Sequence, residues 1–196
     1  MNKVKILQVF DLDETFFRMP SYTGKLCVET DTLKFDTPYD FYDHQLSISE
    51  EAHYIQLIEP VYAAWKEGKA SDATRSILIT HRIEELRETV TALLDKRGIL
   101  FDEMFFLGRK SNKTTTLQEV FEKMWPEVEE IQVFEDSIEQ LGKYQDFFER
   151  LNTSRYLTRP IGSVPYLNIK LYIVDKSKMY RIENFKLSES TRINLI

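Results

Sequence analysis

The sequence lacks long apolar runs, and it contains one cysteine, three histidines and more acidic than basic residues. No apolar run approaches the roughly 20 residues that span a membrane, and none follows the first charged residues, so we expect neither a membrane segment nor a signal peptide. Cys27 alone cannot form an intrachain disulfide, which fits a reducing cytoplasm, and we expect no disulfide-linked partner. The histidines are too scattered to indicate a zinc site.

The formal net charge of -6 argues against tight non-specific binding of nucleic acid across the whole surface. The charge is uneven, because residues 1–150 hold 18 Lys/Arg against 29 Asp/Glu, whereas residues 151–196 hold 8 against 3. A solvated face that protects a sheet edge explains the basic segment as well as a bound polyanion does.

Five short apolar segments each end where polar residues begin, which is typical of buried parallel strands. Helical patterns lie between them, and this alternation predicts an α/β fold: a Rossmann-like three-layer domain with a central parallel sheet. The expected strands are LQVF (7–10), SILIT (76–80), EMFFL (103–107), EIQVFED (130–136) and IKLYIVD (169–175). The expected helices are residues 53–68, 82–98 and 114–125.

The length of 196 residues and a hydrophobic content of 42% predict a single domain over residues 1–196. The connection after the first strand is unusually long, so we expect residues 16–49 to form a small cap-like insertion over the crevice at the strand ends. This segment contains TPYDFYDH and is either a lid or a packed surface loop. Residues 176–196 are expected to be a C-terminal extension.

Asp11 and Asp13 follow the first expected strand directly, in the motif DLDET. On an extended backbone residues i and i+2 face the same way, so both carboxylates would enter the crevice. Their mutual repulsion makes sense if a divalent cation neutralises one and the other carries a proton during turnover. A plain acidic loop is the alternative, since 32 residues of the chain are acidic.

Phosphoryl transfer through an aspartyl-phosphate also needs a hydroxyl for the phosphate oxygens, a fixed cation and a second acidic anchor for Mg²⁺. The sequence offers one candidate for each at the end of an expected strand or the start of a helix. Each is weak alone, because such residues often cap helices or are solvated, but their joint occurrence in this order favours a phosphoryl-transfer site. The candidates are Thr80, Lys110 or Lys113, and Glu135 with Asp136.

These motifs resemble those of the haloacid dehalogenase (HAD) superfamily of Mg²⁺-dependent phosphohydrolases, and most of all the HAD domain of the Swiss Army Knife RNA-repair proteins. The resemblance extends over roughly residues 4–175 and includes DLDET, LITHR, GRKSNK and FEDS. Two departures stand out: His81 replaces the usual Gly after the phosphate-binding residue, and Gln140 stands where relatives often have His. The larger repair proteins also carry domains that this sequence does not contain.

The resemblance implies that Asp11 is the nucleophile and Asp13 the general acid/base, and that Mg²⁺ is the cofactor. Catalysis would then also use Thr80, which binds phosphate, and Lys113, which neutralises the transferring group. The metal-binding residues it implies are Asp11, Asp13 (through its backbone carbonyl), Glu135 and Asp136. The substrate-binding residues that we expect around them are Thr15, which supports the loop, together with His81, Arg82 and, as the alternative lysine, Lys110.

The substrate is expected to be a phosphomonoester, with an RNA or DNA end, and a 3′-phosphate in particular, as the most specific interpretation. Aromatic residues flanking the crevice could stack on a base: Phe16, Phe17, Tyr39, Phe41 and Tyr42. A nucleotide or sugar phosphatase and a catalytically silent HAD-like binding module are the alternatives. A nucleotide-sugar glycosyltransferase would also use a DxD motif, but it would leave Thr80, Lys113 and the second acidic pair unexplained.

Overall fold

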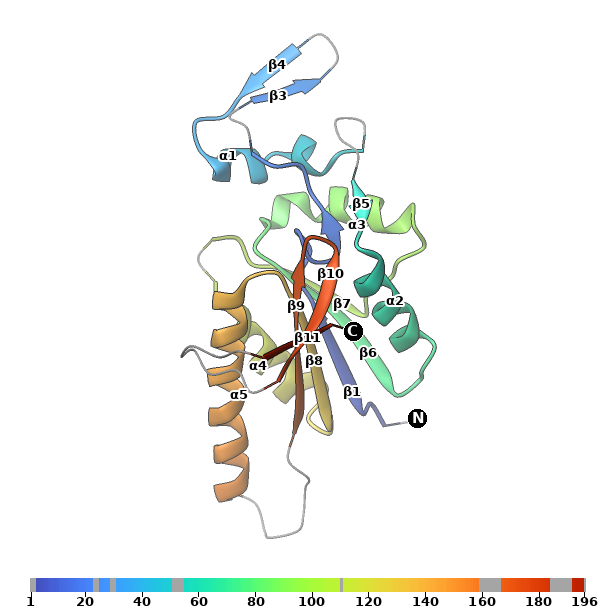
Figure 1. Cartoon of the computed structure of the whole chain (residues 1–196), viewed down its shortest axis with the longest axis vertical. Helices are drawn as coiled ribbons and strands as arrows, with labels where there is room; N and C mark the ends of the chain where they lie inside the picture. The colour runs from blue at the N-terminus through green and yellow to red at the C-terminus, as the bar shows by residue number, and fades with distance from the viewer. Residues whose placement is uncertain are drawn as a thin grey trace.

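The centre of the molecule is a seven-stranded sheet with the strand order β11-β10-β9-β8-β1-β6-β7 (Figure 1). Strands β9, β8, β1, β6 and β7 are parallel, whereas β10 and β11 run antiparallel at one edge. The strands are β1 (Ile6–Phe10), β6 (Thr74–Thr80), β7 (Glu103–Phe106), β8 (Glu130–Glu135), β9 (Asn168–Asp175), β10 (Lys178–Glu183) and β11 (Arg192–Leu195). The computed structural model describes residues 3–22, 25–28, 31–50, 55–109, 111–158, 167–183 and 192–195.

Both faces of the sheet are covered by helices, and this makes three layers. Alternate residues of β1 enter different cores: Leu7 and Val9 pack with α4 and α5, whereas Phe10 packs with α2 and α3. That period of two, with both faces apolar, is what a central parallel strand requires. The predicted Rossmann-like α/β fold is therefore confirmed.

The observed helices differ in part from the predicted ones. The helix expected at 53–68 begins only at Glu59, and the pattern at 82–98 forms a 3-10 turn followed by a helix. The long helix α5 was not predicted, although Leu141, Tyr144 and Phe148 provide apolar side chains at helical spacing. The helices of the main body are α2 (Glu59–Lys69), η2 (Glu84–Leu86), α3 (Arg87–Asp95), α4 (Lys113–Met124) and α5 (Ile138–Thr158). Among the described residues no helix is long and apolar enough to cross a membrane.

The segment between β1 and α2 forms small elements at the carboxyl end of the parallel strands (Figure 1). A short pair of β2 with β5 lies at its base, and the β3–β4 hairpin lies farthest from the sheet. The strand β5, which pairs with β2, follows the expected insertion at 16–49 in the sequence, so the folded segment extends past residue 49. Its elements are β2 (Phe17–Arg18), β3 (Lys25–Val28), β4 (Asp31–Lys34), α1 (Pro38–Tyr42), η1 (Gln45–Ile48) and β5 (Gln56–Leu57).

The TPYDFYDH motif forms the short helix α1. Thr37 and Asp40 make a reciprocal capping box, and Pro38 occupies the first turn, where its missing N–H is harmless. Phe41 is buried against Phe35, whereas Tyr39 on the same helix is 60% exposed. Local sequence therefore specifies the helix α1, in which the Tyr39 ring is exposed to solvent.

The described part of the C-terminal extension continues the sheet. The chain turns at Lys176 and Ser177, which both adopt positive φ, and β10 returns antiparallel to β9. β11 pairs with β10 in the same manner.

Candidate active site

Three neighbouring strands deliver the candidate residues to one edge of the sheet. β1 lies between β6 and β8, and Phe10 is in register with Leu78 and Phe134. Asp11 directly follows β1, Thr80 ends β6, and Glu135 ends β8. In an open parallel sheet this carboxyl edge, where the chain crosses over in both directions, is the usual place for a ligand.

Asp11, Lys113 and Glu135 form a buried ionic centre. Lys113 is the first residue of α4, and its Nζ lies 2.6 Å from Asp11 Oδ1 and 2.7 Å from Glu135 Oε2. All three side chains are less than 10% exposed. Asn112 caps α4 by accepting a hydrogen bond from the N–H of Thr114, which fixes the helix start and thereby the lysine.

Two carboxylates facing one ammonium leave an excess negative charge in a buried place. Burial, opposed by Lys113 and reinforced by Glu135, raises the pKa of Asp11 to about 7. Burial likewise raises the pKa of Glu135 to about 7 against the effect of Lys113. For Lys113, burial favours the neutral amine, but the Asp11 and Glu135 charges outweigh it and raise the pKa of its ammonium. The lysine is therefore a permanent cation, and the excess charge calls for a proton or a metal ion.

A set of carboxylate oxygens suited to a hard cation lies here. One oxygen each from Asp11, Glu135 and Asp136 lies within 4.8 Å of the others. Asp136 opens towards solvent, and partial desolvation together with the Asp11 charge raises its pKa to about 6. Oxygen donors of this kind fit Mg²⁺, so the residues present fit the expected ion.

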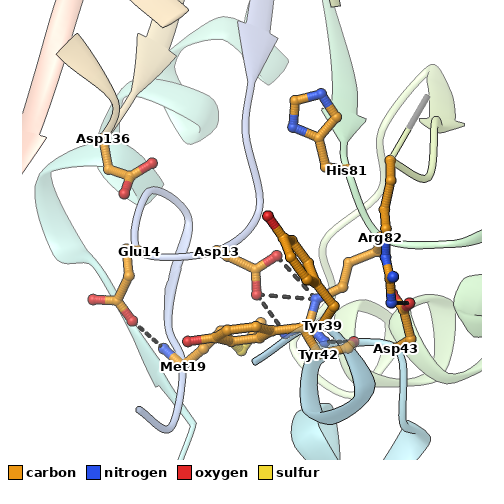
Figure 2. Close-up of a pocket in the computed structure, with 10 residues that line it drawn as sticks. Asp13, Glu14, Met19, Tyr39, Tyr42, Asp43, His81, Arg82 and Asp136 are labelled. Carbon is orange, nitrogen blue, oxygen red and sulfur yellow. Dashed lines mark hydrogen bonds and ion pairs between the residues drawn. The ribbon is translucent and has the colours of Figure 1, made fainter. Parts of the chain in front are cut away.

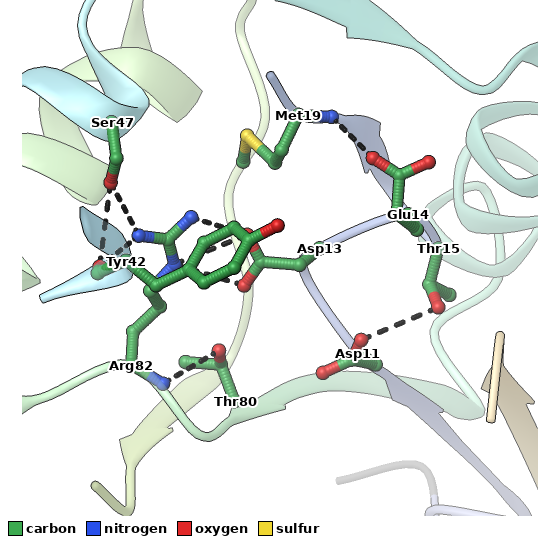
Figure 3. A network of polar contacts seen from close by, with 9 residues as sticks. All are labelled: Asp11, Asp13, Glu14, Thr15, Met19, Tyr42, Ser47, Thr80 and Arg82. Atoms are coloured by element: carbon green, nitrogen blue, oxygen red, sulfur yellow. Dashed lines mark hydrogen bonds and ion pairs between the residues drawn. The ribbon is translucent and has the colours of Figure 1, made fainter. Parts of the chain in front are cut away.

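The side chain of Asp13 turns away from this cluster towards Arg82 (Figure 3). Arg82 donates from Nε to both Asp13 oxygens at 3.1 and 3.0 Å, and its Nη2 lies 2.5 Å from Oδ1. The same guanidinium donates to the Tyr42 carbonyl and to Ser47 Oγ, both in the insertion. Arg82 is 3% exposed, so the insertion and the sheet jointly lock the carboxylate of Asp13.

The turn after β1 explains why the two aspartates face different partners. Glu14 adopts a positive φ of 54°, and its carboxylate accepts a hydrogen bond from the N–H of Met19. The N–H groups of Phe16 and Phe17 both donate to the Leu12 carbonyl, which closes the turn. The chain therefore leaves the extended conformation immediately after Asp13.

Two buried hydroxyls complete the carboxyl edge. Thr15 Oγ1 donates to Asp11 Oδ2 at 3.4 Å, and this contact orients the carboxylate. Thr80 Oγ1 accepts a hydrogen bond from the N–H of Arg82 at 3.1 Å. Because it accepts there, the Thr80 hydroxyl keeps its own proton available for another acceptor.

A cavity of about 670 Å³ lies beside Asp13, between the sheet edge and the insertion (Figure 2). This volume is in the range of sites for nucleotide-sized molecules. Partial burial and the Lys113 charge lower the pKa of His81, so its imidazole is neutral at pH 7. Burial and the Asp13 charge raise the pKa of Tyr42, so its hydroxyl keeps its proton. The lining residues are Asp13, Glu14, Met19, Tyr39, Tyr42, Asp43, His81, Arg82, Arg109 and Asp136.

The structure thus brings together most of the residues singled out in the sequence. Asp11, Lys113, Glu135 and Asp136 share the ionic centre, whereas Lys110 lies outside the described residues. Thr15 contacts Asp11 of this centre, Thr80 contacts the N–H of Arg82, and Asp13, His81 and Arg82 line the cavity. Of the five aromatics considered for stacking, Phe16, Phe17 and Phe41 are core residues, and Tyr39 and Tyr42 line the cavity.

Sequence reasoning missed four polar residues of this region: Glu14, Asp43, Ser47 and Arg109. Ser47 and Asp43 lie in the insertion and pair with Arg82 and Arg109, which follow other strands. No local pattern predicts such pairs, because the partners are at least 35 positions apart. Only the TPYDFYDH capping signal hinted that the insertion has a fixed shape.

Comparison with known proteins finds similar solved structures and one matching family model. A chain of the Pnkp1/Rnl/Hen1 RNA repair complex aligns with 77% of this chain at 19% sequence identity, with a TM-score of 0.44. A second structure of the Pnkp1/Rnl/Hen1 complex aligns with 72% of it at 20% identity, with a TM-score of 0.45. The chain spans only 42% of the length of each of those chains. No curated protein sequence matches.

A family model described as HAD domain family 1 in Swiss Army Knife RNA repair proteins matches residues 37–182. The matched range contains Thr80, Lys113 and Asp136 and begins after Asp11 and Asp13, whose place in the site rests on the geometry above. The match covers well over half of the 196 residues, and the chain therefore belongs to the HAD domain family of the Swiss Army Knife RNA repair proteins.

Proposed function

We propose that this chain is a Mg²⁺-dependent phosphomonoester hydrolase that works through an aspartyl-phosphate on Asp11. The observation that carries the proposal is the buried contact of Asp11 with Lys113, next to a second pair of acids. A purely structural ion pair would need one carboxylate for one ammonium. Here two buried carboxylates and a third beside them create a repulsion that a proton or a bound cation relieves.

In the first step an Asp11 oxygen attacks phosphorus, and the bond from phosphorus to the leaving oxygen breaks. Thr15 and Lys113 hold the two Asp11 oxygens, so the carboxylate is oriented before the substrate arrives. The Lys113 ammonium and the Thr80 hydroxyl stabilise the charge that spreads over the phosphoryl oxygens. Asp11, Glu135, Asp136 and the Asp13 backbone carbonyl would hold Mg²⁺, which would supply further positive charge next to the phosphoryl group.

Asp13 supplies the acid and base catalysis. Its carboxyl gives a proton to the leaving oxygen and in the second step takes one from water, whose oxygen displaces Asp11 from phosphorus and releases inorganic phosphate. Arg82 acts as a positioning residue, because three donated hydrogen bonds fix the Asp13 carboxylate at the mouth of the cavity.

The most specific substrate we propose is a 3′-phosphate at a nucleic-acid end, with RNA first. The family description concerns RNA repair, and the cavity beside Asp13 has room for a terminal nucleoside. The insertion at 16–49 would then act as a small cap of a single 1–196 domain, because it supplies the wall of that cavity. A small-molecule phosphatase is the second candidate, since four acidic side chains around the cavity disfavour a highly charged leaving group.

The reaction is tested by release of phosphate from p-nitrophenyl phosphate. We expect activity with Mg²⁺, none in excess EDTA and little with Ca²⁺, whose longer and looser coordination would misplace Asp11. Asp11→Asn should abolish turnover and keep the fold, whereas Asp95→Asn, an exposed acid on α3, should change nothing. Activity of Asp11→Asn near the wild-type value would eliminate the mechanism.

The substrate class needs a separate comparison. The values of kcat/KM for a 3′-phosphorylated oligoribonucleotide, a 5′-phosphorylated one and a 3′-mononucleotide are measured at two salt concentrations. We expect the 3′-phosphorylated oligonucleotide to be preferred, and the preference to weaken with salt if Lys and Arg contact its backbone. Equal rates for the mononucleotide at low salt would favour the small-molecule alternative.

A further inference from the structure

Tyr39 is the exposed aromatic residue of a helix whose other apolar ring is buried. It is 60% exposed, whereas Phe41, two positions later, is 1% exposed. The Tyr39 side chain lines the cavity beside Asp13, and Figure 2 shows it there with Tyr42 and Met19. Core packing does not account for a large ring in this position.

Arg109 holds the Tyr39 ring in place from the main body of the protein. Its guanidinium carbon lies 4.6 Å from the centroid of the ring, and its Nη2 donates to Asp43, which follows α1. An arginine over an aromatic face both orients the ring and leaves a planar, weakly hydrated surface beside it. The ring is therefore positioned before any ligand arrives, although it is largely open to solvent.

The chemistry of the cavity selects for a neutral, planar group. Tyr39, Tyr42 and Met19 provide apolar and polarizable surface. Arg82 and Arg109 are paired with Asp13 and Asp43, and the further acids Glu14 and Asp136 leave an excess of negative charge. A second phosphate in this space would meet those carboxylates, whereas a base would meet the rings. The cavity also adjoins Asp13, which on the proposed function serves the leaving oxygen, so its occupant is the leaving group.

We infer that Tyr39, held by Arg109 and Asp43, forms a subsite on which the terminal nucleobase of the leaving group stacks. This inference rests on the proposed function and names the part of the substrate that the insertion contacts. A base is recognised here by its planar face rather than by its edge, so all four bases are accepted with modest differences.

The test compares two 3′-phosphorylated oligoribonucleotides that differ only in the terminal nucleotide, which carries a base in one and is abasic in the other. Stacking on an aromatic side chain predicts a kcat/KM about 5- to 150-fold higher with the base in the wild-type protein. Tyr39→Ala should bring this ratio close to one, and Tyr39→Phe should restore it, because the ring and not the hydroxyl is needed. Leu100→Ala, at a similarly exposed position outside the cavity, should keep the wild-type ratio.

The outcomes separate this inference from the proposed function. Equal rates for both oligonucleotides in the wild-type protein would overturn the subsite and leave the phosphatase intact. Hydrolysis of p-nitrophenyl phosphate but of neither oligonucleotide would overturn the nucleic-acid substrate and the subsite together. If no substrate is hydrolysed, the proposed function fails, and binding of the same two oligonucleotides, measured by fluorescence anisotropy with Asp11→Asn, still decides whether the base contributes.

Discussion

Two ionic contacts of this protein differ in their exposure to solvent. Lys113 meets Asp11 and Glu135 where all three side chains are nearly inaccessible, whereas Arg109 meets Asp43 at the rim, with 48% of the arginine side chain exposed. Charges in water interact weakly and adapt freely, but buried charges interact strongly and cannot be left unpaired. The buried centre is therefore suited to the chemistry, and the rim contact to adjusting which leaving group fits.

The largest effect should come from breaking the buried centre with Lys113→Met. Loss of the ammonium removes the stabilisation of the phosphoryl charge and should lower kcat about 10³-fold. It also leaves Asp11 and Glu135 unpaired, which at pH 7 should cost about 3 kcal/mol of unfolding free energy. The measurements are phosphate release and urea unfolding.

The pH dependence and a matched control sharpen this prediction. The pKa values of Asp11 and Glu135 are both raised to about 7, so the two carboxyls become neutral as the pH falls below that value. The destabilisation by Lys113→Met should therefore shrink from pH 8 to pH 5. Lys123→Met removes an exposed lysine of the same helix and should change neither quantity. A loss of stability that is equal at both pH values would contradict the electrostatic explanation.

Arg82 links the two regions, since it binds Asp13 on one side and the insertion on the other. Arg82→Gln should lower kcat about 10²-fold for an alkyl phosphate, whose poor leaving group needs the acid, and less for p-nitrophenyl phosphate. The same asymmetry is expected for Asp13→Asn. Arg87→Gln, which removes a neighbouring arginine paired with Glu84, is the control. Equal losses on both substrates would mean that Arg82 serves the fold or the phosphate rather than Asp13.

Metal binding should stabilise the protein more at high pH than at low pH. The pKa values of Asp11 and Glu135 (about 7) and of Asp136 (about 6) lie above the usual values of 3.8 and 4.5. Without metal, the contribution of these three carboxyls to the free energy of unfolding is fully present below about pH 4. It falls as the pH rises towards 7, because their ionisation is disfavoured in the folded state. Mg²⁺ competes with these protons, so its effect should grow over the same range.

The measurement is the thermal midpoint at pH 5, 6, 7 and 8 with and without Mg²⁺. At a concentration one hundred times its Kd the ion adds about 2.7 kcal/mol, which is several degrees for a chain of this size. Asp136→Asn should remove most of the shift. A shift of the same size at every pH would show that the ion does not compete with protons for these carboxylates.

The sheet and the ionic centre could be predicted from the sequence because both depend on local patterns. Apolar runs marked the strands, and the polar residue after each run had to lie at the same edge. The residues alone offered both Lys110 and Lys113 near the start of a helix, and the preference for Lys113 came from the family resemblance. An insertion at 16–49 could be predicted from the length of the connection, but its internal structure could not, because the strands β2 and β5 have only two residues each and carry no periodic signal.

The contacts of Arg82 that hold the Asp13 carboxylate could not be predicted for the same reason. Arg82 could be proposed for phosphate from its position after Thr80, but its partners Tyr42 and Ser47 lie 40 and 35 residues earlier in the chain. Their meeting depends on the closed shape of the insertion, which the capping box of α1 only begins to specify. Long-range polar pairs of this kind follow from tertiary structure and not from spacing.

The smallest effect should come from the rim contact. Arg109→Gln and Asp43→Asn should each lower the unfolding free energy by less than about 1 kcal/mol, and a double-mutant cycle should give a coupling of the same small size. That coupling should fall further in high salt, because exposed charges are screened. The opposite result, a coupling above about 2 kcal/mol that resists salt, would mean that the insertion is fastened firmly to the sheet. A weak contact agrees with the inferred subsite, since Arg109 and Asp43 need only orient the Tyr39 ring, whereas the buried centre carries the chemistry.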